Sequence, residues 1–196
     1  MDFRSESTYK ETRFPVELAS TLIPDAYRSE AFFVEEQEQI FTKSWVPVAA
    51  ISDVAEPSQT ITRTVAGRSV IITMNPDGEL RAFLNMCRHR GSRLVQEDCT
   101  LRSPKIRCPY HAWAYDLDGA CIGTPMFEGS DIPEDMQAAF DMTDVKAFDK
   151  ADYSLFGVRV EAWGPLIFVS LDLDIGPLSE WLGDLTERLR GYDLEQ

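Results

Sequence analysis

The sequence predicts a mainly β domain of antiparallel strands with a helix at each end. Short runs rich in β-branched and aromatic residues alternate with turn dipeptides through the middle of the chain. Apolar residues at helical spacing flank these runs over about residues 30–43 and 178–190. We therefore divide the chain into an N-terminal arm and helix (1–44), a β domain (45–172) and a C-terminal helix (173–196).

The predicted strands are joined by recognisable turns. Residues 59–65 and 68–74 flank Ala66-Gly67, which is typical of a tight hairpin. A turn at residues 75–78 leads into a strand at 79–85. Further short strands are predicted at residues 107–108, 113–117, 120–123, 156–162 and 166–171, with turns at Asp118-Gly119 and Gly164-Pro165.

The segments outside these strands are predicted from caps and composition. Residues 1–28 should form an extended arm, and Ser29 should cap the helix that follows. Residues 124–152 should be irregular and acidic, with one helical turn at 134–140. The final helix is marked by the apolar residues Leu178, Trp181, Leu182, Leu185 and Leu189.

The composition excludes several classes of partner. The net charge of −14 argues against binding to nucleic acid or to an anionic membrane surface. Residues 81–111 differ from the rest, because they hold seven Lys and Arg against two acids, a net of +5. The longest apolar run, residues 166–169, is far shorter than the roughly 20 residues of a membrane span. The polar N-terminus resembles no signal or transit peptide, so we expect a cytoplasmic protein.

Two Cys/His pairs are the strongest functional signal. The chain has only two His, and each stands close to a Cys, in Cys87-Arg88-His89 and in Cys108-Pro109-Tyr110-His111. Each pair offers one thiolate and one imidazole that can face a common point. Four Cys in a chain with no export signal indicate metal or redox sites before disulfides. A Cys2His2 zinc site stays open as an alternative, although zinc fingers commonly place both Cys in one pair and both His in the other.

The two pairs and their neighbours resemble the cluster-binding boxes of Rieske non-haem iron ring-hydroxylating oxygenases, in the N-terminal part of the alpha (large) subunit. The likeness rests on residues 87–91 (CRHRG) and 108–113 (CPYHAW), and it extends over roughly residues 20–196 through residues 40–45, 115–119 and 163–169. It implies a Rieske-type antiparallel β-sandwich with an inserted cluster-binding subdomain at about residues 85–123. One Rieske-type 2Fe–2S cluster would be held there, with Cys87 and Cys108 on one iron and His89 and His111 on the other.

The resemblance also implies roles for other residues of the boxes. Gly91 would let backbone amides approach the cluster, and Pro109 would stiffen the second box. Tyr110 and Trp113 would pack around the cluster and shield it from water. The positions of the disulfide found in respiratory Rieske proteins correspond to Ser92 and Tyr110, so that brace should be absent.

Side chains outside the ligand set receive simpler interpretations. Cys99 and Cys121 lie outside the boxes and are expected to be buried thiols. Arg90 and Arg93 are candidates for contact with a partner, or else are solvated arginines.

The expected function is one-electron transfer. In this family a reductase or ferredoxin donates the electron, and a mononuclear iron in the oxygenase catalytic domain or in a neighbouring alpha subunit receives it. That iron needs two His and a carboxylate, and this chain has no His beyond the two in its pairs. We therefore expect the Rieske domain of an oxygenase, detached or truncated, that does not oxygenate a substrate by itself. The alternatives are a free-standing Rieske ferredoxin and a zinc-stabilised interaction module.

Overall fold

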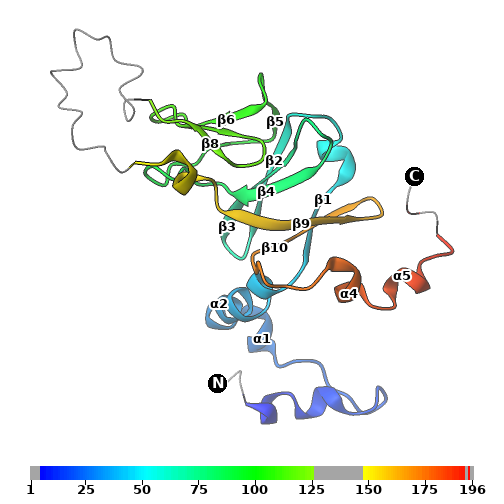
Figure 1. The fold of residues 1–196 in the computed structure, drawn as a ribbon. Coiled ribbons are helices and arrows are strands. Elements are labelled where there is room, and N and C mark those ends of the chain that lie inside the picture. The colour runs from blue at the N-terminus through cyan, green and yellow to red at the C-terminus, as the bar shows by residue number, and fades with distance from the viewer. Residues whose placement is uncertain (1–4, 126–147, 193, 195–196) are drawn as a thin grey trace, which may run out of the picture.

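The computed structural model describes residues 5–125, 148–192 and 194, and it is mainly β, as the sequence predicts (Figure 1). Seven strands form an antiparallel sheet in the order β1-β10-β9-β4-β3-β2-β5. Three more strands form a second, small sheet in the order β6-β7-β8. The helical turn predicted at residues 134–140 lies outside the described residues.

The predicted hairpin is the centre of the large sheet. Strands β2 (Gln59–Val65) and β3 (Arg68–Met74) pair in register from Thr60–Thr73 to Val65–Arg68. Ala66 and Gly67 join them with φ angles of 47° and 73°, the left-handed pair that a two-residue hairpin requires. The other strands of this sheet are β1 (Val46–Ala50), β4 (Leu80–Leu84), β5 (Cys99–Thr100), β9 (Gly157–Trp163) and β10 (Leu166–Ser170).

Strand β3 is buried on both faces, and this divides the core in two. Side chains alternate between the faces of a strand, so Val70 and Ile72 pack on one face and Ile71 on the other. The first face packs mainly on aliphatic residues of the large sheet. The second face packs with Phe83 under the small sheet, in the cluster that also contains Cys87 and Cys108.

The small sheet consists of β6 (Lys105–Arg107), β7 (Ala114–Asp116) and β8 (Cys121–Gly123), close to the predicted strands. Its β7–β8 turn is tied to the large sheet by Asp118, whose Oδ1 accepts hydrogen bonds from Asn75 Nδ2 at 3.0 Å and from Arg81 Nε at 2.9 Å. The carbonyl of Gly119 in the same turn accepts the N–H of Leu155 at 2.8 Å. The small sheet is therefore fixed against the large one.

The N-terminal prediction is right for the cap and wrong for the arm. Ser29 Oγ accepts the N–H of Phe32 at 3.3 Å and so caps α2 (Glu30–Gln39). The predicted helix continues to residue 43 only as the 3-10 turn η3 (Phe41–Lys43). The arm is not extended throughout: it contains η1 (Glu6–Thr8), η2 (Lys10–Arg13) and α1 (Pro24–Arg28), where proline suits the first helical turn.

The single C-terminal helix predicted over residues 178–190 is wrong in its continuity. Two short helices, α4 (Leu178–Leu182) and α5 (Leu185–Arg188), occupy this region. Gly183 separates them, because its φ of 54° is incompatible with a right-handed helix. Two further 3-10 turns are η4 (Ile51–Val54) and η7 (Lys150–Tyr153).

Candidate metal centre

Two loops carry the predicted site, and they have the same backbone hydrogen-bond pattern. In the first loop (residues 87–92) the N–H of Cys87 donates to Ser92 O at 2.8 Å, and the N–H of Gly91 returns to Cys87 O at 2.9 Å. In the second loop (residues 108–113) the N–H of Cys108 donates to Trp113 O at 2.8 Å, and the N–H of Ala112 returns to Cys108 O at 3.1 Å. The backbone N–H and the carbonyl of each Cys are thus both hydrogen-bonded within its own loop.

A left-handed residue closes each loop at the same position. Gly91 has a φ of 69° and Ala112 a φ of 59°. A Cβ on Gly91 would approach only the Met86 side chain, at 3.9 Å. The reason for glycine at position 91 is therefore its backbone conformation, and crowding by a side chain is not needed to explain it.

The two thiols are buried together. Cys87 is 1% exposed and Cys108 is 3% exposed, and each thiol influences the pKa of the other. Burial raises the pKa of the Cys87 thiol. Burial also acts to raise the pKa of the Cys108 thiol, but hydrogen bonds from the backbone of His111 and Tyr110 outweigh it and lower that pKa. The thiolate is the form that binds metal, and the backbone donors around Cys108 favour it there.

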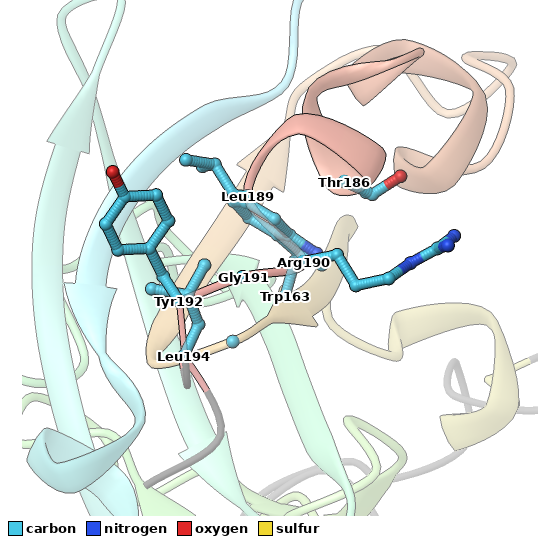
Figure 2. Close-up of a pocket in the computed structure, with 8 residues that line it drawn as sticks. Trp163, Thr186, Leu189, Arg190, Gly191, Tyr192 and Leu194 are labelled. Atoms are coloured by element: carbon cyan, nitrogen blue, oxygen red, sulfur yellow. The ribbon is translucent and has the colours of Figure 1, made fainter.

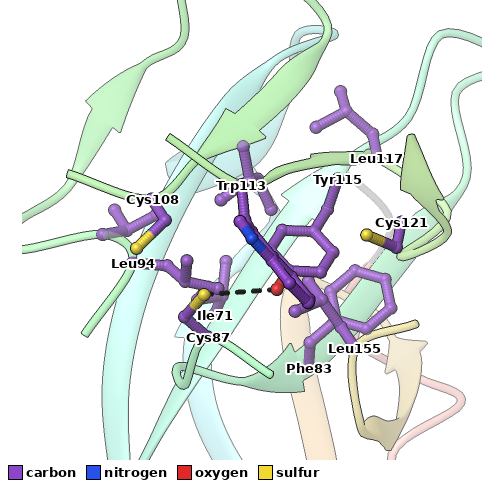
Figure 3. Packing of buried hydrophobic residues seen from close by; sticks show 12 residues of the cluster. Ile71, Phe83, Cys87, Leu94, Cys108, Trp113, Tyr115, Leu117, Cys121 and Leu155 are labelled. Atoms are coloured by element: carbon purple, nitrogen blue, oxygen red, sulfur yellow. Dashed lines mark hydrogen bonds between the residues drawn. The ribbon is translucent and has the colours of Figure 1, made fainter. Parts of the chain in front are cut away.

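Hydroxyl groups contact both sulfur atoms. Tyr115 Oη lies 3.3 Å from Cys87 Sγ and accepts the N–H of Arg88 at 3.0 Å, so its own proton can point at the sulfur (Figure 3). The Ser92 side chain, on the first loop, hydrogen-bonds the Cys108 thiol of the second loop and contributes to its lowered pKa. All four Cys are free thiols, and the Ser92 hydroxyl joins the first loop to the second.

The two imidazoles meet edge to face. The rings of His89 and His111 have centroids 4.7 Å apart at an angle of 69°. The Nδ1 atoms of both are buried, and Nδ1 of His111 has no hydrogen-bond partner among the described residues. Burial, with the charges of His111 and Arg90, lowers the pKa of His89 and favours the neutral ring that can bind metal. The structure thus brings all four predicted residues together.

The donor set of two thiols and two imidazoles fits a 2Fe–2S cluster. No three His, Cys, Asp or Glu side chains within residues 5–125, 148–192 and 194 are placed to hold a single metal ion. A structural zinc needs four protein ligands on one ion, so the zinc alternative finds no support in the geometry. A 2Fe–2S cluster needs only two protein ligands on each iron, and a buried Nδ1 without a hydrogen-bond partner on His111 fits such a ligand.

The aromatic surroundings agree in part with expectation. Trp113 is 1% exposed and stacks on His89 with a centroid distance of 4.9 Å and an interplanar angle of 8°. Phe148 and Tyr153 contact the other parts of its ring. Tyr110 packs on the His111 ring with a centroid distance of 3.7 Å, as expected, although 62% of its own surface is exposed.

The remaining Cys residues differ from each other. Cys121 is buried as predicted, beyond the Tyr115 ring in Figure 3. Cys99 is exposed, which corrects the prediction of a buried thiol. It lies in the two-residue strand β5 at the edge of the large sheet.

Two contacts near the site were not predicted from the sequence. Tyr115 contacts Cys87, and its place two residues after Trp113 on a strand could have suggested a side chain on the same face. Arg88 donates to Ser154 O at 2.6 Å and lies 4.0 Å from the ring of Phe156, so it anchors the first loop to the segment before β9. No local sequence signal predicts this second contact.

A separate cavity of about 440 Å³ lies at the C-terminal end of the chain. Figure 2 shows Leu189, Arg190 and Tyr192 around it, together with Trp163 at the end of β9. None of the four site residues lines it, so it is distinct from the metal centre. Among the described residues no helix is long and apolar enough to cross a membrane.

Comparisons with known proteins agree on one domain type. The Rieske [2Fe-2S] domain family matches residues 44–148. The carnitine monooxygenase oxygenase subunit of Acinetobacter pittii is 34% identical over 163 residues, which are 83% of this chain and 40% of that protein. The biphenyl 2,3-dioxygenase subunit alpha of Rhodococcus jostii is 31% identical over 168 residues, or 86% of this chain and 33% of that protein.

Solved structures give the same result. The apo form of the quaternary ammonium Rieske monooxygenase CntA superposes with a TM-score of 0.75 at 33% identity, covering 88% of this chain and 46% of that chain. Naphthalene 1,2-dioxygenase from Rhodococcus sp. has a TM-score of 0.70 at 29% identity, covering 86% and 36%. The chain thus spans less than half the length of these relatives.

Proposed function

Because the chain belongs to the Rieske [2Fe-2S] domain family, we propose that Cys87, His89, Cys108 and His111 hold its cluster. The two thiolates would bind one iron and the two imidazoles the other, so that each loop gives one ligand to each iron. The observation that carries this assignment is the pairing of two loops of equal hydrogen-bond pattern, with their thiols buried together and their imidazoles 4.7 Å apart. When bound, the cluster accepts and returns one electron at a time.

The surrounding residues would prepare the site for this role. Trp113 excludes water from one face of His89 and fixes its ring orientation. Tyr115 and Ser92 present hydroxyls to Cys87 and Cys108, and the backbone of His111 and Tyr110 stabilises the Cys108 thiolate. Arg88 holds the first loop against the segment before β9.

The domain would serve a larger oxygenase as its electron carrier. A reductase or ferredoxin would supply the electron, and a mononuclear iron in an oxygenase catalytic domain or a neighbouring alpha subunit would receive it. The sequence has two His, and both are assigned to the cluster, so the two His and carboxylate of such an iron must come from other residues than these 196. The free thiols fit a reducing compartment such as the cytoplasm.

Metal analysis and spectroscopy test the ligand assignment. We expect two irons and two sulfides in each chain, and the optical and paramagnetic signals of a Rieske centre. Cys87→Ser and Cys108→Ser should abolish the cluster, because a hydroxyl is a poor ligand in place of a soft thiolate. His89→Ala and His111→Ala should remove the Rieske signature even where some iron is retained.

The same protein provides the controls. Cys99→Ser and Cys121→Ser remove thiols outside the two loops and should leave the spectrum unchanged. Stoichiometric zinc without sulfide, or an unchanged spectrum in any of the four ligand variants, would contradict the assignment.

A further inference from the structure

A groove of about 410 Å³ lies between the first loop and the large sheet. The start of β3, the end of β4 and the first loop form its walls. Its lining residues are Arg68, Ser69, Leu84, Asn85, Met86, Gly91 and Arg93. Neither His89, His111 nor Tyr110 is among them, so the groove is separate from the imidazole edge of the site.

The floor of the groove is held by one buried side chain. Asn85 is 5% exposed, and its Oδ1 accepts the N–H groups of Leu94 and Val95, each at 3.0 Å. Its Nδ2 donates to Val95 O at 2.7 Å and to Ser69 Oγ at 3.2 Å. These bonds tie β3, β4 and the chain after the first loop to each other. The groove is therefore formed before any partner arrives, which lowers the entropic cost of binding.

The charge of the groove is positive and is not neutralised within the described residues. Arg68 and Arg93 are exposed and form no salt bridge there, and Arg93 only donates through Nε to the carbonyl of Val95 at 3.1 Å. Arg90, next to the groove on the first loop, is likewise exposed and without an ion pair in the described part of the chain. By contrast Arg63 and Arg81, on neighbouring strands, are each paired with two carboxylates.

The groove also comes close to a cluster ligand. Met86 lines it with 37% of its surface exposed, and the next residue is Cys87, which is 1% exposed. Gly91, on the same loop, is exposed, and the Met86 side chain is the one neighbour that a Cβ there would approach, at 3.9 Å. A partner bound here would contact the flexible Met86 thioether, one residue before Cys87, and the backbone of Gly91. The arginines would lie at the rim of this interface.

We propose that this groove is the docking surface for the protein that delivers electrons to the domain, and that this protein presents acidic residues around its own redox centre. The proposal rests on the proposed function and adds the surface and the charge of the partner. One electron would leave the reduced centre of the donor, which becomes oxidised, and would reduce this domain. Since the imidazole edge stays uncovered, the acceptor could use that edge without displacing the donor.

The sign of the salt dependence provides a sharp test. This chain carries a net charge of −14, so net charges alone would repel an acidic donor, and added salt would speed the reaction. Steering by the arginines of the groove predicts the reverse, a reaction that slows as salt rises. The measurement should cover roughly 0.05 to 0.3 M salt, where the Debye length is on the order of 10 Å and local charges dominate.

The probe is an acidic plant-type [2Fe–2S] ferredoxin, reduced beforehand and mixed with the oxidised domain in a stopped-flow instrument. Its potential of about −400 mV lies below the Rieske range, so electrons flow toward this domain. We expect the second-order rate constant to fall with salt in the wild type. The double variant R68E/R93E should be about tenfold slower at the lowest salt and should lose or reverse that dependence.

Controls separate the groove from net charge and from damage to the cluster. Arg28→Glu makes one such charge reversal, half of that in R68E/R93E, at an exposed position on α1 far along the chain, and should alter the rate constant by less than about twofold. The spectrum and the potential should be unchanged in R68E/R93E. Binding of the oxidised ferredoxin, measured by titration calorimetry, should be weakened by R68E/R93E and not by Arg28→Glu.

Three kinetic or binding results would overturn the proposal: a wild-type rate constant that rises with salt, a double variant with wild-type rate and binding, or an equal loss in Arg28→Glu. The absence of a Rieske spectrum would contradict the proposed function instead. The calorimetric comparison would still decide whether the groove binds the acidic protein, because it needs no electron transfer. Self-association of this chain through the groove, seen as a dimer that R68E/R93E dissolves, would also overturn it.

Discussion

The hydroxyl of Tyr115 lies 3.3 Å from Sγ of Cys87 and at the same time accepts the N–H of Arg88. The backbone N–H occupies one lone pair of the hydroxyl, so the hydroxyl proton is available to the sulfur. A hydrogen bond to a ligand sulfur stabilises the more negative, reduced state of a cluster and raises its potential. Under the proposed ligand assignment, Tyr115 would therefore help to set how readily the domain accepts an electron.

Tyr115→Phe should lower the midpoint potential while the cluster stays bound. The loss of a hydrogen bond of about 1 kcal/mol corresponds to about 40 mV for a one-electron couple. Potentiometric titration followed by the optical spectrum gives the value. Tyr153→Phe is the matched control, because it keeps its ring against Trp113 and its hydroxyl makes no bond to either thiol among the described residues. An equal shift of the midpoint potential in both variants would show that the hydrogen bond to Cys87 is not the cause.

Gly91→Ala should destabilise the domain by about 1–2 kcal/mol. The space around the new methyl group is sufficient, so the cost comes from the left-handed backbone at φ 69°. Gly157→Ala is the comparison, since that glycine has open space and no positive φ, and it should be neutral or stabilising. Urea unfolding of both variants measures the difference. Equal free energies of unfolding would mean that the first loop tolerates a right-handed residue.

Asp98→Asn should weaken the fold at neutral pH and have no effect in acid. The carboxylate of Asp98 accepts from Arg63 and from the Thr62 N–H, both at 2.8 Å. Burial acts to raise the pKa of Asp98, but these hydrogen bonds outweigh it and hold the pKa below its usual value of 3.8. The stabilisation is therefore complete above the unfolded-state pKa and is lost as the pH falls through the lower folded-state pKa. Because the side chain is 49% exposed, the contribution should stay below about 1 kcal/mol.

The check is the difference in unfolding free energy between wild type and Asp98→Asn, measured at pH 7 and again near the acid limit of folding. Asp77→Asn, in the exposed β3–β4 turn, provides a control for the general effect of removing one negative charge. A difference for Asp98→Asn that grows in acid would contradict a lowered folded-state pKa.

Arg88→Lys should destabilise the first loop although it keeps the charge. The guanidinium donates to the carbonyls of Ser154 and Asp152 and lies over the ring of Phe156, and an ammonium cannot reproduce the planar contact. We expect a loss of about 1–2 kcal/mol in unfolding free energy. Arg90→Lys, at an exposed position two residues later, should leave the unfolding free energy unchanged. Equal stability of the two variants would show that the anchor contributes nothing.

The local parts of the fold could be predicted from sequence, because their signals are local. The β2–β3 hairpin follows from Ala66-Gly67 between two alternating runs, and the Ser29 cap follows from one side chain. The four residues of the candidate centre could be named because they are the only two His and the Cys beside them. These inferences need no knowledge of how distant segments meet.

The remainder depends on contacts between distant residues. Strand β5 exists because Cys99 pairs with Thr60, and the same edge position leaves the Cys99 thiol exposed. The helical periodicity of residues 178–190 continues across Gly183, yet the backbone turns there into the left-handed region. The contact of Tyr115 with Cys87 joins residues 28 apart in sequence. Periodicity and composition carry no information on such pairings.

The equal hydrogen-bond pattern of the two loops has a consequence for the speed of electron transfer. Both Cys are fixed by backbone bonds within their own loop, and a hydroxyl contacts each sulfur. When the charge of the centre changes by one, the N–H and O–H groups around it are already in place. Few atoms therefore need to move in response. The nuclear rearrangement that accompanies each oxidation and reduction should be small, so the domain is suited to cycle quickly between its two states under a modest driving force.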